Sequence, residues 1–174
     1  MYEIDQKLLL LEKESNPIMT SIIGVGQMGS EIVTQISLMA GIIPLFAVDV
    51  SEEKVLNAFK DTRFEDMVIF TNVLSEAEKA AEENKVIATT DYKIAIELSK
   101  VNVVIDSTGL PEMGARIALE CLKNKKNLVM MNVECDVTVG PIISKYFKNS
   151  GLVYTLTAGD ESGSIVELYR FANA

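Results

Sequence analysis

The chain contains no histidine and no tryptophan, and only 6% of its 174 residues are aromatic. Without histidine, the chain cannot build a Ser-His-Asp or Cys-His nucleophilic system or a histidine zinc site. A hydride-transfer enzyme whose acid is a histidine of this chain is excluded for the same reason. The absence of histidine therefore excludes several large classes of enzyme.

Cysteine is also scarce, with Cys121 and Cys135 as the two thiols of the chain. They lack the spacing of metal ligands and form no Cys-x-x-Cys pair. This pattern predicts two inert thiols in a reducing compartment, no catalytic cysteine and no metal site.

Basic residues are fewer than acidic ones: the chain has 16 Lys and Arg and 25 Asp and Glu, for a net charge of −9. Nucleic-acid binding needs clustered cations, so the balance argues against a nucleic-acid partner. The one basic cluster, at Lys123, Lys125 and Lys126, fits the end of a helix, where cations offset the dipole; an anion site is the alternative.

Long apolar runs are missing too, because no run approaches the ~20 residues of a membrane helix. The N-terminus carries Glu3 and Asp5 in place of a basic segment before an apolar stretch. We therefore expect a soluble, cytoplasmic protein with no membrane partner.

What the chain does contain is a glycine-rich turn, Gly-Val-Gly-Gln-Met-Gly, at residues 24–29. Gly24 permits a tight turn after a strand, Gly26 lets the backbone approach a pyrophosphate, and Gly29 allows close packing of helix and strand. Gln27 and Met28 open the following helix, whose N-terminus favours an anion. The motif predicts a dinucleotide site, although a glycine turn without a nucleotide is the structural alternative.

An acidic residue, Asp49, closes the next apolar run. A carboxylate at this place accepts hydrogen bonds from the adenosine ribose hydroxyls in NAD sites. Because it also repels a 2′-phosphate and no arginine follows closely, NAD is favoured over NADP. Ser51 and Lys54 could still contact a phosphate.

The remaining pattern alternates strands and helices without repeats or a linker. Strands are expected at 18–23, 43–49, 86–89, 101–106, 127–132 and 152–157. Helices are expected at 1–14, 27–40, 51–60, 91–99, 112–123, 137–149 and 162–172, with a further cap at Ser75 and Glu78. The prediction is an α/β fold: a doubly wound, mostly parallel six-stranded sheet of the Rossmann type with helices on both faces. Residues 1–16 form a helical extension, and residues 17–174 form the domain.

In such a sheet the ligand lies beyond the carboxyl ends of the strands, so residues that directly follow strands are candidates. They are Ser107, Thr108, Gly109, Asn132, Glu134 and Asp160. Loops at strand ends are polar in any soluble protein, which is the plainer explanation for several of them. Glu134 follows a very apolar strand, where a carboxylate can bind substrate hydroxyls, bind a metal ion or take a proton.

Residues 127–141 and 153–167, together with the turns at 24–29 and 106–109, resemble the N-terminal part of homoserine-dehydrogenase-like oxidoreductases. That group includes reductoisomerase-like enzymes that carry a C-terminal SAF domain. The resemblance implies NAD or NADP along residues 24–29, with Ser107, Thr108, Gly109 and Asn132 near the ribose and nicotinamide. Asp160 matches the metal-binding acids of reductoisomerases faintly. Together with Glu134, it is a candidate catalytic residue.

Two departures bear on the substrate. Val133 stands where the dehydrogenases have a lysine, and Glu161-Ser162 stands where close relatives have Gln-Pro. Members of the group are also much longer, so the chain is expected to be a cofactor half without the catalytic domain.

The function this predicts is hydride transfer between nicotinamide and a small polar or phosphorylated carbonyl compound or alcohol, with a small-molecule substrate as partner. A nucleotide-sensing regulatory module without catalysis is the alternative, and a methyltransferase ranks last. Sheet edges and the apolar stretch at residues 8–11 could build a homodimer.

Overall fold

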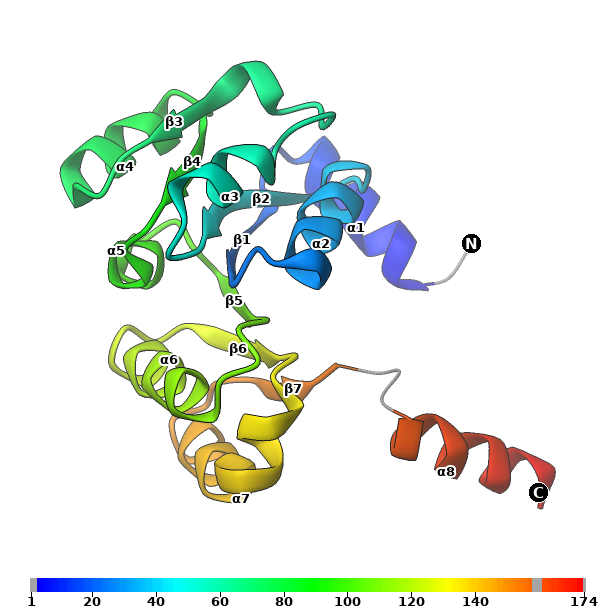
Figure 1. The fold of residues 1–174 in the computed structure, drawn as a ribbon. Coiled ribbons are helices and arrows are strands. Elements are labelled where there is room, and N and C mark those ends of the chain that lie inside the picture. Colours follow the sequence, from blue (N-terminus) through cyan, green and yellow to red (C-terminus); the bar gives the residue numbers. More distant parts are fainter. Residues whose placement is uncertain (1–2, 158–160, 174) are drawn as a thin grey trace.

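The computed structural model describes residues 3–157 and 161–173. Its centre is a seven-stranded sheet in the order β3-β4-β2-β1-β5-β6-β7 (Figure 1). All neighbouring strands run parallel. The strands are β1 (Ile18–Ile23), β2 (Ile42–Val48), β3 (Val68–Phe70), β4 (Val86–Thr89), β5 (Val103–Asp106), β6 (Asn127–Met130) and β7 (Tyr154–Leu156). The predicted parallel α/β fold is confirmed, but the expected count of six strands was wrong.

The strand missing from the prediction is β3. It is a three-residue edge strand, and all of its residues are only half-buried. So short and partly exposed a segment lacks the buried apolar run that marks the central strands.

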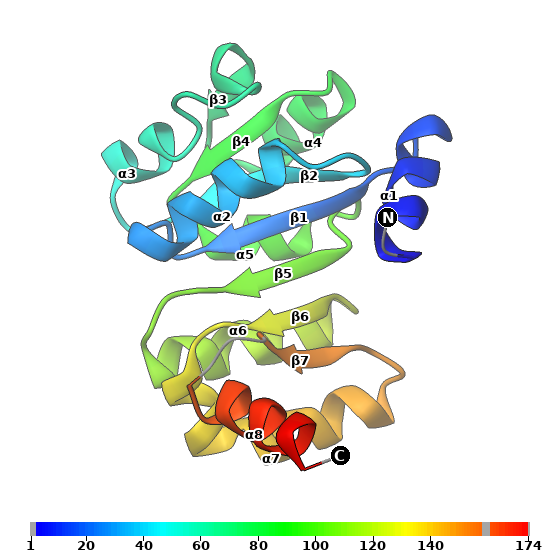
Figure 2. The ribbon, with the colours of Figure 1, turned by 90° about the vertical axis from the view of Figure 1, so that its right-hand side faces the viewer.

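Helices cover both faces of the sheet, as expected for a doubly wound fold (Figure 2). They are α1 (Glu3–Lys13), α2 (Gln27–Ser37), α3 (Glu52–Asn57), α4 (Leu74–Glu82), α5 (Tyr92–Glu97), α6 (Pro111–Lys123), α7 (Val133–Asn149) and α8 (Glu161–Ala172), with a 3₁₀ turn η1 (Glu65–Met67). Buried residues of α2 and α3 form one core cluster with the sheet. Those of α4, α5, α6 and α7 form the other. None of the helices in the described ranges is long and apolar enough to cross a membrane.

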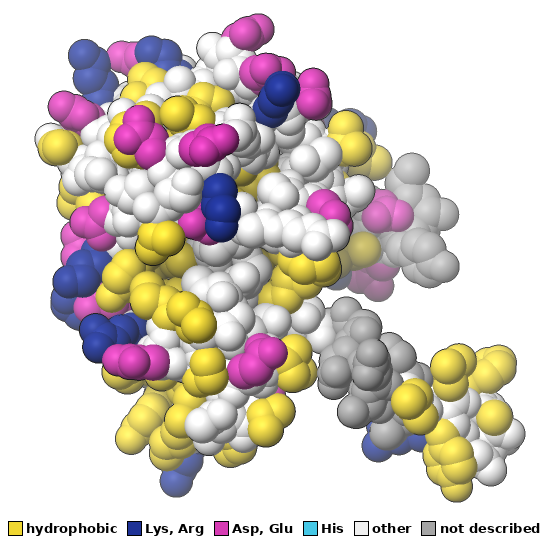
Figure 3. Space-filling view, in the orientation of Figure 1, with side chains coloured by type: hydrophobic (Ala, Val, Ile, Leu, Met, Phe, Trp, Pro, Cys, Tyr) yellow, Lys and Arg dark blue, Asp and Glu magenta, His cyan; other side chains and the backbone are white. Residues whose placement is uncertain are grey.

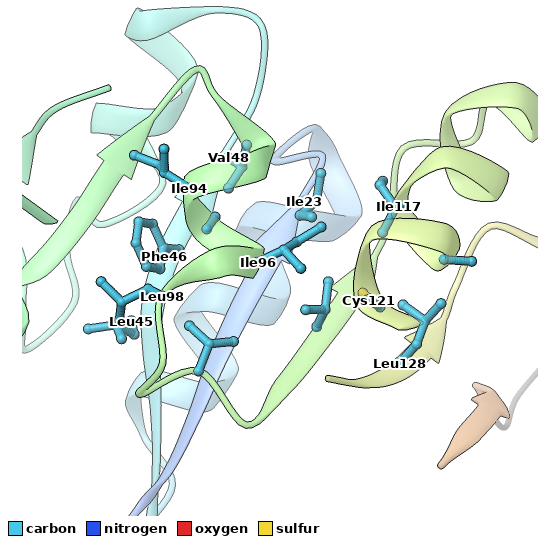
Figure 4. Packing of buried hydrophobic residues seen from close by; sticks show 14 of the residues in the cluster. Ile23, Leu45, Phe46, Val48, Ile94, Ile96, Leu98, Ile117, Cys121 and Leu128 are labelled. Atoms are coloured by element: carbon cyan, nitrogen blue, oxygen red, sulfur yellow. The ribbon is translucent and has the colours of Figure 1, made fainter. Parts of the chain in front are cut away.

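The larger core lies under the middle of the sheet (Figure 4). Ile94 and Ile96 of α5 pack with Ile23, Phe46 and Val48 of the two central strands. Each fully buried side chain of this size contributes roughly 1.5–3 kcal/mol through the apolar area it removes from water. This packing fixes the carboxyl ends of β1 and β2, where the predicted site residues lie.

Among the described residues, strand β6 is covered by helices on one face only. Leu128 and Met130 of β6 are buried in the larger cluster. Val129 lies between them, so its side chain points to the opposite face, where it is half-buried and belongs to neither cluster. In the described part of the chain, that face of β6 therefore lacks a packed helix.

The last helix, α8, also exposes apolar side chains. Ile165, Leu168, Tyr169 and Phe171 are 65%, 68%, 68% and 84% exposed. Figures 1 and 3 show α8 standing away from the body of the molecule with hydrophobic side chains at its surface.

Two predicted helix starts were wrong. Helix α7 begins at Val133, with Asn132 as its N-cap, so the segment read as a loop before residue 137 is helical. Helix α4 begins at Leu74 after Val73, so Ser75 lies inside the helix and does not cap it. The chain before α4 is fixed instead by Thr71, whose hydroxyl accepts from the Val73 N–H at 3.1 Å.

The basic cluster after α6 contains one buried cation. Lys126 is 6% exposed, and its ammonium group donates to the carbonyls of Leu98 and Val101 at 2.8 Å each and of Ser99 at 3.2 Å. Burial lowers the pKa of Lys126. The lysine therefore satisfies the carbonyls that follow α5, whereas the prediction assigned the cluster to the end of its own helix.

Candidate functional site

The site lies at the carboxyl ends of β1 and β5, where the order of the sheet reverses. Strand β1 pairs with β2 on one side and with β5 on the other. The chain leaves these two strands in opposite directions, which opens a crevice in sheets of this kind. A cleft of about 320 Å³ occupies this place. Of the predicted residues, it is lined by Gly24, Gly26, Asp49, Ser107 and Thr108.

The three glycines of the turn have different surroundings. Gly24 has a φ of +95°, and a Cβ there would lie 2.8 Å from the Ser107 backbone. A Cβ on Gly29 would lie 1.9 Å from the Gly24 carbonyl oxygen, so this glycine allows α2 to pack on the turn. A Cβ on Gly26 would meet nothing within 4 Å. Two glycines are therefore required by the protein itself, and Gly26 faces open space.

The turn leads directly into the N-terminus of α2. Gly26 is the N-cap of α2, and no side chain caps the helix. The first N–H groups of an α-helix have no partner within the helix, so they remain available to an anion. Gln27 and Met28 supply the first two of these groups, and the Met28 side chain is 53% exposed.

Asp49 follows β2 and presents an oriented carboxylate. Its Oδ1 accepts from the Ser51 N–H at 3.2 Å and lies 3.9 Å from the Lys54 ammonium nitrogen. Its Oδ2 receives no hydrogen bond from the described residues. The Asp49 side chain is 12% exposed. One oxygen thus fixes the group, while the other is available to a ligand hydroxyl.

The walls of the cleft include residues that the sequence reasoning missed. They are Val50, Thr90, Tyr92, Leu110 and Met113. Val50 and Leu110 are 94% and 62% exposed, although both are apolar. No motif marks these positions, because an apolar residue that lines a cleft looks like a core residue in the sequence.

Asn72 fixes one of these walls. Its side-chain oxygen accepts from the Thr90 N–H at 2.9 Å and from the Thr89 hydroxyl at 2.7 Å. This amide joins the chain after β3 to the chain after β4, and so holds Thr90 at the cleft. No local sequence pattern indicates this role of Asn72.

The turn after β5 is tied to the glycine turn. The Ser107 hydroxyl donates to the Gly24 carbonyl at 2.7 Å. Thr108 donates its N–H and its hydroxyl to Asp106 Oδ1, at 3.0 and 2.7 Å. Gly109 has a φ of +68°, which a residue with a side chain rarely adopts. These contacts hold the two sides of the cleft together.

Asp106 and Asn132 form a buried polar pair below this turn. Asn132 is 1% exposed, and its amide nitrogen donates to Asp106 Oδ2 at 3.3 Å and to the Leu110 carbonyl at 2.9 Å. Its amide oxygen accepts from the Cys135 N–H at 3.1 Å. Asn132 therefore does not line the cleft, and its hydrogen bonds are made within the protein.

Burial raises the pKa of Asp106, while hydrogen bonds from Thr108 and Asn132 act in the opposite direction. Three donors surround the carboxylate, which is the arrangement that compensates a buried charge. Burial also raises the pKa of the Cys121 and Cys135 thiols. Burial therefore disfavours the reactive thiolate form of both cysteines.

Of the two catalytic candidates, Glu134 is not brought to the cleft. Glu134 is exposed in the first turn of α7 and is not among the cleft residues. Asp160 lies outside the described residues. The structure thus assembles a ligand cleft, and neither predicted acid is part of its described lining.

Comparison with known proteins agrees with this geometry. Residues 24–139 match the family described as homoserine dehydrogenase, NAD binding domain. The matched range contains the glycine turn, Asp49, the turn after β5 and Asn132. No curated protein matches the chain.

Several solved structures have a similar fold. A putative oxidoreductase from Klebsiella pneumoniae matches 81% of this chain and 34% of its own, with a TM-score of 0.59 and 17% identity. A scyllo-inositol dehydrogenase from Lactobacillus casei, solved with NAD(H) and scyllo-inositol, matches 80% of this chain and 36% of its own, with a TM-score of 0.56 and 12% identity. An NAD-binding protein from Listeria innocua matches 80% and 34%, with a TM-score of 0.51 and 20% identity. This chain therefore spans between 34% and 36% of these proteins.

Proposed function

We propose that this chain, which belongs to the family of homoserine dehydrogenase NAD-binding domains, is the cofactor domain of an oxidoreductase. The reaction would move a hydride between nicotinamide and a small polar or phosphorylated carbonyl compound or alcohol. The observation that carries the proposal is the cleft between β1 and β5, which combines an uncapped helix N-terminus with an acceptor at Asp49. When bound, the nicotinamide ring would supply or accept the hydride.

Each part of a dinucleotide has a chemical counterpart in this cleft. The pyrophosphate suits the N–H groups at the start of α2, next to the open side of Gly26. The ribose hydroxyls suit the free Oδ2 of Asp49, and the apolar side chains of Val50 and Leu110 suit the faces of a base. The turn at Ser107 completes the cleft on the opposite side.

The preferred cofactor in this proposal is NAD. A carboxylate that accepts from the 2′-hydroxyl of NAD would repel the 2′-phosphate of NADP. Asp49 is held in position by the Ser51 N–H, so it cannot easily turn away from the ribose.

The catalytic half of such an enzyme would be a second domain. Hydride transfer needs a positioned substrate and an acid or base within reach. Two apolar surfaces of this chain lack a partner in the described residues: the face of β6 at Val129, and Leu168 and Phe171 of α8. They are the places where we expect a substrate domain or a second copy to pack. Glu134 and Asp160 remain candidates for the acid in that assembly.

Calorimetric titration with NAD⁺, NADP⁺ and ATP in separate experiments tests the cofactor proposal. Asp49→Ala is expected to weaken NAD⁺ binding about tenfold, because the ribose loses a charged acceptor. Asp66→Ala, at an exposed acid in η1, is the matched control and should bind like the wild type. A preference for ATP, or no binding of either dinucleotide, would contradict the proposal and favour a nucleotide sensor or a scaffold.

A further inference from the structure

Helix α7 contains Gly140 and Pro141 in its interior. A proline has no N–H, so Pro141 cannot donate to the Val137 carbonyl as another residue in a helix interior would. Its ring also crowds that carbonyl, which is why kinks in helices are common at prolines. Glycine is the least favourable helix residue after proline. The helix is therefore weakest between residues 133–140 and 141–149, which we call its first and second halves.

Gly140 is required by a carboxylate beside it. A Cβ on Gly140 would lie 2.3 Å from Asp136 Oδ1. The same oxygen accepts from the hydroxyl of Tyr154 in β7 at 2.5 Å. The glycine thus leaves the space in which the first half of α7 is hydrogen-bonded to the sheet.

Tyr154 contacts both halves of the helix. Its hydroxyl donates to Asp136 in the first half, and its ring centroid lies 5.5 Å from that of Phe147 in the second half. Ile143 and Phe147 are 4% and 0% exposed, so the second half is anchored in the larger core. In the first half the buried side chain is that of Cys135, which is small. The hydrogen bond to Asp136 therefore has a large share in holding the first half.

A hollow of about 540 Å³ lies beside the weak point, between α7 and the edge strand β7. Gly140, Pro141 and Ser144 line it from the helix, and Tyr154 and Leu156 line it from the strand. Because this space is open, a change in the angle between the two halves meets no packed side chain of the described chain there.

The first half of α7 is also tied to the wall of the cleft. The N-cap of the helix, Asn132, donates to the Leu110 carbonyl at 2.9 Å, and Leu110 lines the cleft. Glu134, the candidate acid, is exposed in the first turn of this half. A movement of the first half would therefore carry Glu134 and affect the wall at Leu110.

We propose that Gly140 and Pro141 form a hinge in α7, and that the hydrogen bond between Tyr154 and Asp136 holds this hinge closed. When the bond opens, the first half turns as a unit while the second half stays in the core. The hinge itself is independent of the proposed function. Its use, to move Glu134 relative to the cleft, rests on that function.

NMR relaxation dispersion of the free chain tests the hinge, because it detects exchange between conformations on the μs–ms timescale. The amides of residues 133–140 should share one exchange rate, and those of residues 142–149 should show no dispersion. Tyr154→Phe should increase the open population about tenfold, because a hydrogen bond to a carboxylate is lost. Pro141→Ala restores a donor to the Val137 carbonyl and should decrease the open population about fivefold.

Tyr146→Phe is the matched control, because Tyr146 lies in the second half, is 50% exposed, and its hydroxyl makes no hydrogen bond within the described chain. Asp136→Asn keeps an acceptor for Tyr154 and should open the hinge less than Tyr154→Phe does. Thermal unfolding of each variant shows whether it is folded. Dispersion of equal size in both halves, or none at residues 133–140 in either the wild type or Tyr154→Phe, would overturn the hinge.

Saturation with NAD⁺ tests the link to the cleft. A dinucleotide against Leu110 should reduce the open population by about twofold or more, because the Leu110 carbonyl is bonded to Asn132. If calorimetry shows binding and the open population is unchanged, the link to the cleft is wrong. If calorimetry shows no binding, the proposed function is wrong, while the result for the free chain still decides the hinge.

Discussion

The two sides of the cleft use polar groups in opposite ways. On the side of β1 and β2, the groups are left open: Gly26 has free space, α2 has no side-chain cap, and Asp49 keeps an oxygen without a partner in the described chain. On the side of β5 and β6, they bind one another: Asp106, Thr108 and Asn132 exchange hydrogen bonds, and Asp106 and Asn132 are buried.

This difference distinguishes polar groups that are free to bind a ligand from polar groups that stabilise the fold. Polar residues at the ends of parallel strands share one sequence pattern, yet only some of them keep free hydrogen-bonding capacity. A buried amide or carboxylate must find a partner within the protein, because an unsatisfied group costs about 1–3 kcal/mol. The open side should therefore respond to mutation through binding, and the closed side through stability.

The largest expected effect is a difference in stability between substitutions at two glycines of the same turn. Gly29→Ala should destabilise the protein by about 3 kcal/mol, because the new methyl group would lie 1.9 Å from a backbone oxygen. Gly26→Ala should cost only about 1 kcal/mol, because its methyl group enters open space and the loss is the lower preference of alanine for the N-cap position, but it should weaken dinucleotide binding. Urea unfolding and calorimetric titration measure the two effects. Equal stability of both variants would contradict the different roles assigned to the two glycines.

The next comparison pairs Asn132 with Asp49. Asn132→Ala removes the N-cap of α7 and a donor to the buried Asp106, so stability should fall by about 2 kcal/mol. Asp49→Asn should leave stability within about 0.5 kcal/mol, because the carboxylate is at the surface of the cleft. Denaturant titration at neutral pH measures both. A destabilisation by Asp49→Asn as large as that by Asn132→Ala would remove the distinction between the two sides.

The smallest expected effect concerns pH. Burial raises the pKa of Asp106, so the folded protein keeps the Asp106 proton to a higher pH than the unfolded chain does. The unfolded state then binds fewer protons than the folded state between the two pKa values, and the contribution of Asp106 to stability falls as the pH rises through that interval.

Asp106→Asn removes this contribution, so the stability of the wild type relative to the variant should decrease from acidic to neutral pH. Denaturant titrations across that range measure the difference. A difference that increases with pH would mean that the hydrogen bonds from Thr108 and Asn132 outweigh burial.

The sequence predicted the fold well where hydrophobic burial determines the structure. The central strands are apolar runs, and β4 was predicted with the bounds that the structure shows. The helix expected at 91–99 is present as α5, and its N-cap is Asp91, whose carboxylate accepts from the Lys93 N–H at 2.9 Å. Edge strand β3 and the start of α7 were missed, because partly exposed segments and polar first turns resemble loops.

The site was predictable only in part. Gly24, Gly26 and Gly29 belong to a known pattern with a fixed spacing, and the structure gives each of them a distinct environment. The roles of Asn72 and Asn132 depend on residues far away along the chain, so no local pattern shows them. The apolar cleft residues, such as Leu110, carry no signal because they look like core residues in the sequence.

The measurement that tests the account most directly is an NMR titration of the isotope-labelled chain with NAD⁺, read as chemical-shift changes along the backbone. The account predicts changes at residues 24–29, at Asp49 and Thr90, and at the turn after β5, with little change at the buried Lys126. The absence of changes, or changes centred on α7 away from the cleft, would contradict the assignment of the β1–β5 cleft as a dinucleotide site.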